Sequence, residues 1–184
     1  MSLKPLIAVV ATAALAVGSV LALSAGADAA NSSRHAQRVQ HWRITTSAVG
    51  PIELGETKTA LKRAGYAYYP CGGDHHPCYF KGKLGQDIGF DVNAAGRVKQ
   101  IMVNVYKAHG RVFATAHGAH VGTTVAKLKA KEHPKHLGNY GYGEAYAIHK
   151  GKHRWITFFT TGKTATSKVY SISVSTKKKP IQGR

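Results

Sequence analysis

Acidic residues and cysteines are scarce in this 184-residue chain. It has 8 Asp and Glu against 26 Lys and Arg, a formal net charge of +18, and only two cysteines. Two cysteines exclude a scaffold held by several disulfides and a four-cysteine zinc site. The basic excess predicts adhesion to polyanions such as nucleic acid, anionic wall polymer or anionic lipid. Most of the basic residues are lysine, which favours nonspecific adhesion over the specific reading of bases.

Catalytic signatures are missing as well. The chain has no G-x-S-x-G, H-E-x-x-H or phosphate-loop motif. Its 11 histidines and 26 basic residues make chance combinations common, so a set such as Glu144, His149 and Arg154 is weak evidence for an active site. We therefore predict a noncatalytic protein that uses no cofactor and no metal. The alternative is a small secreted cationic hydrolase, ribonuclease-like or wall-hydrolase-like, that acts on an anionic substrate.

Long hydrophobic runs are absent after residue 23, and the one before it resembles an export signal. Lys4 precedes an uncharged apolar stretch from Leu6 to Leu23, and Ala27 and Ala29 have the A-x-A spacing of a cleavage site. We predict a signal peptide at residues 1–30 and a secreted, extracellular protein with no membrane span after cleavage. An uncleaved membrane anchor is the alternative.

The two cysteines enclose the segment CGGDHHPC, residues 71–78. Paired cysteines oxidise outside the cell, and the glycines and proline between these two suit a tight reversal of the chain. Zinc is the alternative, because Cys71, His75, His76 and Cys78 are all possible ligands. The spacing does not match the usual zinc arrangement, so we predict a disulfide.

An internal repeat relates the two halves of the chain at one constant offset. The matched positions are Leu54–Gly55 with Val121–Gly122, Thr57 with Thr124, and Leu61 with Leu128. Each copy places an apolar residue and a glycine before a threonine that can cap a helix, and alternating apolar residues then indicate three strands. The strand WITFF is apolar on both sides, which predicts burial of both its faces.

We therefore predict an α+β fold, in which two tandem helix-plus-three-strand repeats form one antiparallel sheet with helices on one face. The expected segments are a flexible arm at residues 31–42, repeat 1 at 43–108, repeat 2 at 109–176 and a basic tail at 177–184.

The repeated apolar-x-x-G-x-T-x-x-x-L block, followed each time by three strands, resembles the β-lactamase-inhibitor-protein-like fold over residues 43–176. It is also similar to the small lipoprotein of the outer-membrane assembly machine. The resemblance implies a noncatalytic protein whose concave sheet face grips another protein. It also implies a disulfide in the first repeat, at the position of Cys71 and Cys78.

In such inhibitors the hairpin between the first two strands of each repeat contacts the partner. The corresponding residues here are Lys81, Lys83 and Asp87 in the first hairpin, and Lys150, Lys152 and Trp155 in the second. Both hairpins are basic, which departs from the family and counts against β-lactamase inhibition itself.

Glycine and tyrosine alternate between residues 138 and 147. Tyr140, Tyr142 and Tyr146 could form an adaptable aromatic recognition surface, because tyrosine supplies contact area at low entropic cost. A glycine-rich lead into a strand is the alternative. Together with the hairpins, these residues predict binding of an extracellular protein or an anionic envelope polymer.

Overall fold

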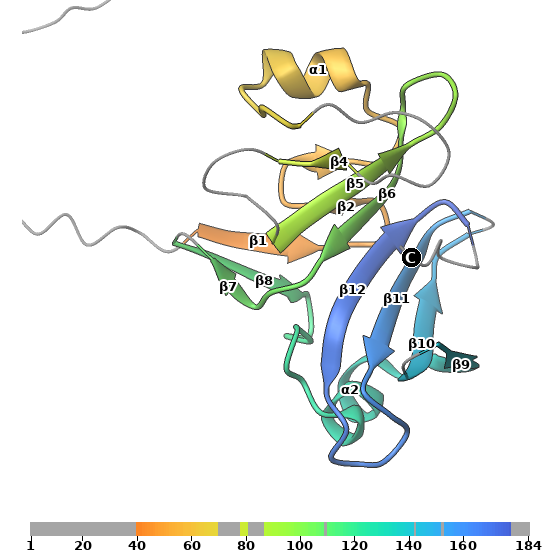
Figure 1. The fold of residues 1–184 in the computed structure, drawn as a ribbon. Coiled ribbons are helices and arrows are strands. Elements are labelled where there is room, and N and C mark those ends of the chain that lie inside the picture. Colours follow the sequence, from red (N-terminus) through yellow and green to blue (C-terminus); the bar gives the residue numbers. More distant parts are fainter. Residues whose placement is uncertain are drawn as a thin grey trace, which may run out of the picture. The chain divides into compact units, whose positions relative to one another are not determined.

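The protein is described from a computed structural model, which covers residues 40–69, 78–80, 87–108, 110–141, 143–151 and 153–177. Within these ranges the fold is mostly β, with two sheets and two short helices. Figure 1 shows the arrangement of these elements.

The larger sheet has seven strands in the order β4-β5-β6-β12-β11-β10-β9. They are β4 (Cys78–Tyr79), β5 (Ile88–Val92), β6 (Val98–Val103), β9 (Lys135–Tyr140), β10 (Gly143–His149), β11 (Trp155–Thr160) and β12 (Val169–Ser175). Every pairing in this sheet is antiparallel. The strands β6 and β12 meet at its centre, where Ile101 lies opposite Val174.

The smaller sheet has five strands in the order β3-β2-β1-β8-β7. They are β1 (Gln40–Ile44), β2 (Ala48–Val49), β3 (Ile52–Glu53), β7 (Lys107–Ala108) and β8 (Arg111–Thr115). This sheet is mixed, because β1 pairs parallel to β8 with Trp42 opposite Phe113. The turn from β2 to β3 needs Gly50, since a Cβ there would lie 2.5 Å from the Trp42 ring and φ is +56°.

Both helices begin at a capping threonine. The Thr57 hydroxyl accepts a hydrogen bond from Ala60 N (3.1 Å) before α1 (Lys58–Arg63). The Thr124 hydroxyl accepts one from Lys127 N (3.4 Å) before α2 (Val125–Glu132). These bonds satisfy amide groups that have no partner within the helix. The capped helices expected after the two threonines are therefore confirmed.

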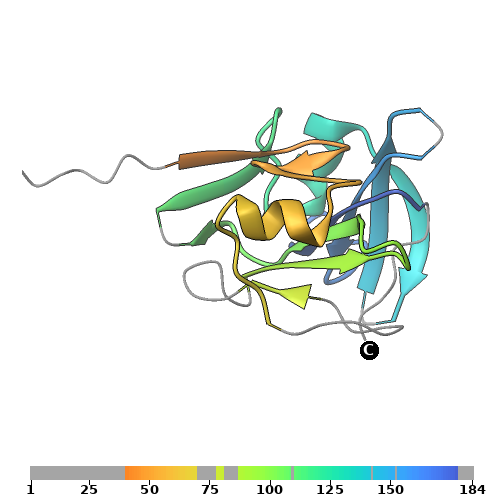
Figure 2. The ribbon, with the colours of Figure 1, turned by 90° about the horizontal axis from the view of Figure 1, so that it is seen from above.

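One hydrophobic core joins the two sheets and the two helices. Leu61 of α1 and Leu128 of α2 are fully buried in the same cluster as Phe113 of β8 and Phe158 of β11. The helices and the smaller sheet lie on one side of the seven-stranded sheet (Figure 2). The other side of that sheet is left outside this core.

The predicted fold class is wrong. We expected two helix-plus-three-strand repeats on a single antiparallel sheet with helices on one face, whereas the chain forms two sheets and is mostly β. The difference arises from residues 40–53 and 107–115, which form the smaller sheet by pairing across the two halves of the chain. Parallel pairing of such distant, short strands leaves no local periodicity in the sequence.

Candidate functional site

Side chains of the seven-stranded sheet alternate between two faces. One face, which includes Ile101, Phe158 and Ile172, belongs to the hydrophobic core. We call the opposite side the outer face. From β4 to β10 its residues are Tyr79, Gly89, Asp91, Gln100, Met102, Ala145, Ala147, His149, Trp155, Thr157, Phe159, Ser171, Ser173 and Ser175. None of them belongs to the core cluster.

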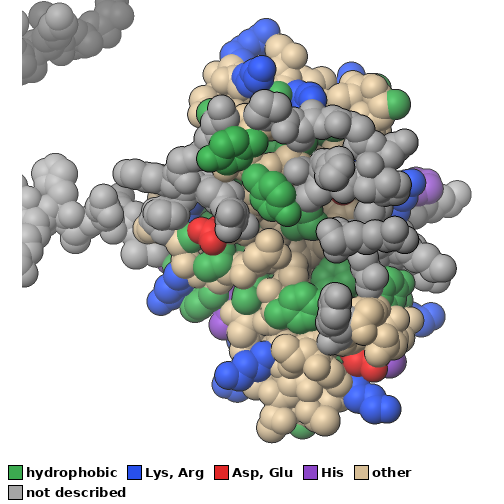
Figure 3. All heavy atoms as spheres, in the orientation of Figure 1, with side chains coloured by type: hydrophobic (Ala, Val, Ile, Leu, Met, Phe, Trp, Pro, Cys, Tyr) green, Lys and Arg blue, Asp and Glu red, His purple; other side chains and the backbone are tan. Residues whose placement is uncertain are grey.

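The outer face combines nonpolar residues with small hydroxyl residues. Phe159, Ala145 and Ala147 are buried although they lie outside the core. Tyr79 remains 38% exposed. Figure 3 views this face, with hydrophobic side chains gathered over its middle and Lys and Arg side chains around its margin. Exposed nonpolar patches are typical of binding surfaces, and the exposed aromatic residue named here is Tyr79, whereas Phe159, Ala145 and Ala147 are buried.

An aromatic group covers one end of the outer face. The Phe159 ring lies 6.2 Å from the rings of Tyr140 and Tyr170. Tyr170 reaches this side because the register of β11 and β12 shifts between Phe159 and Thr160. It is 40% exposed, and burial of the remainder raises the pKa of its phenol. At the other end of β11, the Trp155 ring packs at 4.7 Å against His149.

Within the described part of the chain, two buried hydroxyls at the centre of the outer face have no hydrogen-bond partner. They are Thr157 Oγ1 and Ser173 Oγ, which come from directly paired positions of β11 and β12. The flanking hydroxyls are satisfied, since Ser171 donates to Asn104 Oδ1 (2.8 Å) and Ser175 donates to Lys177 O (2.8 Å). A buried polar group without a partner costs about 1–3 kcal/mol. The described residues therefore carry unfavourable polar burial on this face.

The predicted recognition residues are divided between the two sides of the sheet. Trp155 lies on the outer face, and Tyr140 packs against it through Phe159. Tyr146 is only 1% exposed and belongs to the core, where its ring packs at 4.9 Å against His136. Desolvation by this burial, and then the charge of Glu144, raise the pKa of Tyr146.

The predicted hairpin residues are described only in part. Asp87 immediately precedes β5, and its backbone oxygen accepts a hydrogen bond from Asn104 N (2.9 Å). Lys150 is exposed in the turn between β10 and β11, where its amide donates to Arg154 O (2.9 Å). Tyr142, Lys81, Lys83 and Lys152 lie outside the described residues.

The cysteine prediction also falls partly beyond the described chain. Cys78 is buried in β4 and is disulfide-bonded. Cys71 lies outside the described residues, so its place in the pairing stays a prediction.

Sequence reasoning missed several residues of the outer face, namely Tyr79, Met102, Thr157, Tyr170 and Ser173. The sequence does contain a pattern that indicates the position of Ser173. The stretch SISVS in β12 alternates serine with aliphatic residues, and the aliphatic residues face the core. The serines of a strand with this pattern mark the opposite face of the sheet.

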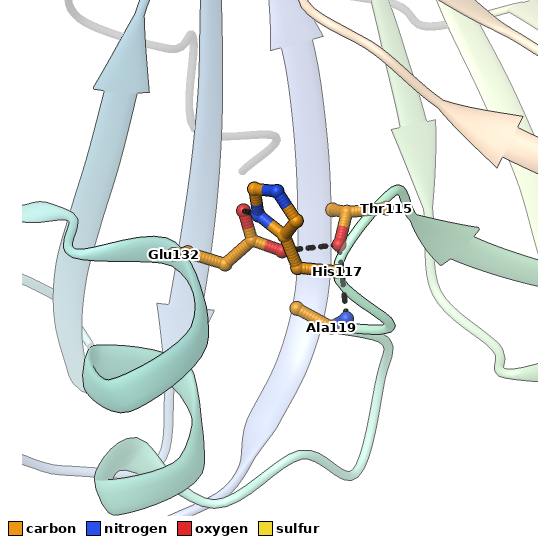
Figure 4. A network of polar contacts seen from close by, with 4 residues as sticks. All are labelled: Thr115, His117, Ala119 and Glu132. Atoms are coloured by element: carbon orange, nitrogen blue, oxygen red, sulfur yellow. Dashed lines mark hydrogen bonds and ion pairs between the residues drawn. The ribbon is translucent and has the colours of Figure 1, made fainter.

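A separate polar network ties α2 to the smaller sheet (Figure 4). The side chain of Glu132, at the end of α2, is 3% exposed and accepts a hydrogen bond from the Thr115 hydroxyl. That hydroxyl accepts a bond from Ala119 N (2.9 Å), and His117 Nδ1 lies 3.3 Å from the second carboxylate oxygen. Threonine and histidine thus contact the same carboxylate. A nucleophile needs the histidine beside its own hydroxyl, so this network fits a structural role.

The trio considered for a hydrolase does not form one cluster. Glu144 pairs with His136, whose Nε2 lies 2.7 Å from its carboxylate. His149 is five residues along β10 and therefore points to the opposite face of the sheet, where it contacts Trp155. Among the described residues, no group of three or more His, Cys, Asp or Glu side chains could hold a metal ion.

Comparisons with known proteins assign neither a family nor a function. No protein-family profile and no curated protein matches the chain. Among solved structures, the uncharacterized protein YfeY from Escherichia coli is similar, with 15% identity, coverage of 74% of this chain and 98% of that chain, and a TM-score of 0.42. Within the described ranges, no helix has the length and hydrophobicity needed to span a membrane.

Proposed function

We propose that this is an exported, noncatalytic protein that binds another extracellular protein on the outer face of its seven-stranded sheet. The observation that carries the proposal is the set of aromatic residues that lie outside the core. Trp155, Phe159, Tyr170 and Tyr79 share this position. Aromatic residues and methionine are enriched in protein interfaces, and charged residues are depleted at interface centres.

The spacing of the aromatic residues indicates the size of the contact. Trp155 and Phe159 lie on one strand with Thr157 between them. Four residues of an extended strand span about 13 Å. Because Phe159 is only 8% exposed, the ring that a partner can reach at that end is Tyr170, which packs against Phe159. Buried aromatic side chains supply most of the binding energy in such contacts.

The net charge favours an acidic partner. The formal net charge of the chain is +18, and basic side chains lie around the margin of the outer face in Figure 3. Such a field accelerates association with a negatively charged protein and is weakened by salt. The aromatic contacts respond little to salt, so a specific complex outlasts the ionic strength that releases a purely electrostatic one.

To test this proposal, the chain is immobilised, and the extracellular proteins of the producing organism that it retains are identified. We expect at least one protein to stay bound at about 0.5 M salt, where charges are screened within several ångströms. Trp155→Ala or Tyr170→Ala should weaken its binding about 30-fold, in line with a loss of about 2 kcal/mol per anchor. The control Tyr106→Ala removes an aromatic ring that stacks on His120 and is not on the outer face.

Two outcomes would overturn the proposal. Retention that is equal in all three variants would mean that the outer face is not the interface. Complete elution at moderate salt would identify the protein as a polyanion binder. If the chain instead hydrolysed RNA or wall polymer, and His136→Gln abolished the hydrolysis, the pair of His136 and Glu144 would be catalytic.

A further inference from the structure

A second concave site lies on the smaller sheet, between the parallel strands β1 and β8. It is a hollow of about 200 Å³ lined by His41, Trp42, Arg43, Val112, Ala114, Thr115 and Ala116. The strand register places His41 opposite Val112 and Arg43 opposite Ala114. Two basic side chains of β1 thus flank a floor of small, mostly nonpolar residues of β8.

The two basic side chains have no anionic partner within the described structure. His41 and Arg43 are two residues apart on one strand, so they point to the same face, and both are exposed. Among the described residues, neither the His41 imidazole nor the Arg43 guanidinium has a hydrogen bond or ion pair. Other arginines are engaged, since Arg97 donates to Gly55 O (3.0 Å) and Arg111 lies 5.1 Å over the Trp42 ring.

The carboxylate that contacts the lining of the hollow is already occupied. Glu132 accepts a hydrogen bond from Thr115, and its second oxygen lies 3.3 Å from His117 (Figure 4). Thr115 lies opposite Ile44 in the register whereas Arg43 lies opposite Ala114, so Thr115, the residue that Glu132 contacts, and Arg43 point to opposite faces of the smaller sheet. Among the described residues, no protein acceptor pairs with the exposed Arg43 and His41 donors beside the hollow.

We propose that this hollow binds a phosphate group, either as the free anion or within a phosphodiester polymer. The planar guanidinium of Arg43 can donate two parallel hydrogen bonds to phosphate oxygens, and the His41 imidazole supplies a further donor. The volume is below the roughly 300–1,000 Å³ of pockets for drug-sized ligands, which suits a single tetrahedral anion. The site lies on the smaller sheet and is independent of the outer face of the larger one.

Titration of the full chain with inorganic phosphate, followed by calorimetry and by amide chemical shifts, tests the proposal. We expect saturable binding with shifts at residues 41–43 and 112–116. Arg43→Gln should weaken phosphate binding about ten-fold, and Arg43→Lys should recover only part of it because lysine lacks the bidentate fork. The control Arg63→Gln makes the same charge change at an exposed position of α1 and should alter the affinity less than about two-fold.

A second experiment uses soluble poly(glycerol phosphate) to distinguish the two sources of phosphate. Tighter binding of the polymer, with the same dependence on Arg43, would identify a polymer segment as the ligand. Equal binding per phosphate would identify the free anion. Equal losses in Arg43→Gln and Arg63→Gln, or no saturable binding of either probe, would overturn the proposal. Trp155→Ala should bind phosphate normally, which separates this test from that of the outer face.

Discussion

The two faces of the seven-stranded sheet are built from different chemistry. On β11, Phe158 joins the core, whereas its neighbours Thr157 and Phe159 point outward and are buried outside it. The core face is mostly nonpolar, although Glu144 and Thr160 lie on its side of β10 and β11. The outer face mixes aromatic rings with hydroxyls, two of which have no partner among the described residues. Burial alone therefore does not define a core. Contact with the main cluster and satisfaction of polar groups distinguish the face that belongs to the core from the outer face, for which we propose a role in binding.

The largest expected effect compares two adjacent phenylalanines. Phe158→Ala should lower the free energy of unfolding by about 3–5 kcal/mol, because it leaves a cavity in the core. Phe159→Ala should lower it by about 1–3 kcal/mol, since that ring contacts mainly Tyr140 and Tyr170. Urea denaturation of both variants provides the measurement. Equal losses would show that the outer face is a second structural core.

A second pair compares two buried threonines of β11. The single proton of the Thr160 hydroxyl can be donated to Gly162 O (2.7 Å) or to Glu144 O (3.1 Å), whereas the Thr157 hydroxyl has no partner among the described residues. Thr160→Val should therefore lower the free energy of unfolding by about 1–3 kcal/mol. Thr157→Val removes an unsatisfied group of similar shape and should be neutral or stabilising by up to about 1 kcal/mol. A clear loss of stability in Thr157→Val would show that this hydroxyl is satisfied in solution.

Local features of the fold could be predicted from the sequence. The threonines at 57 and 124 cap helices as expected, and the leucine four residues after each is buried. The alternating stretches 97–105 and 168–176 contain β6 and β12. The sequence also predicts that both faces of the strand WITFF are buried. This is observed, since Ile156 to Thr160 are all buried. Caps and period-two alternation are set by neighbouring residues, so a single sequence reveals them.

Features that depend on distant pairing could not be predicted. The smaller sheet requires Trp42 to meet Phe113, and nothing near either residue indicates the other. The place of Tyr170 on the outer face depends on a register shift, which strict alternation does not show.

Tyr146 is a different case, because it lies two residues from Ile148 in β10 and shares its face. Alternation within that strand was enough to place its ring toward the core.

The helix caps lie on the core side and should affect stability without affecting binding. Thr57→Ala should lower the free energy of unfolding by about 1 kcal/mol, because Ala60 N loses its acceptor. Thr124→Ala should cost less, because its hydrogen bond to Lys127 N is longer, at 3.4 Å. Thermal unfolding of both variants gives these values, and retention of the partner serves as the control. Weaker binding by either variant at a temperature where it is fully folded would contradict the assignment of binding to the outer face.

The smallest expected effect compares tyrosines on the two faces at alkaline pH. Burial raises the pKa of both Tyr146 and Tyr170 above the ordinary value of about 10. The neutral phenol is therefore favoured in the folded state, so this contribution is present below about pH 10 and is lost as the pH rises through the folded pKa. Tyr146→Phe should make the fall in unfolding free energy above pH 10 less steep than in the parent chain. Tyr170→Phe should change the slope less, because that ring remains 40% exposed. Urea denaturation between pH 8 and pH 11 measures both slopes, and a larger change in Tyr170→Phe would indicate that the outer face excludes water more completely than the core.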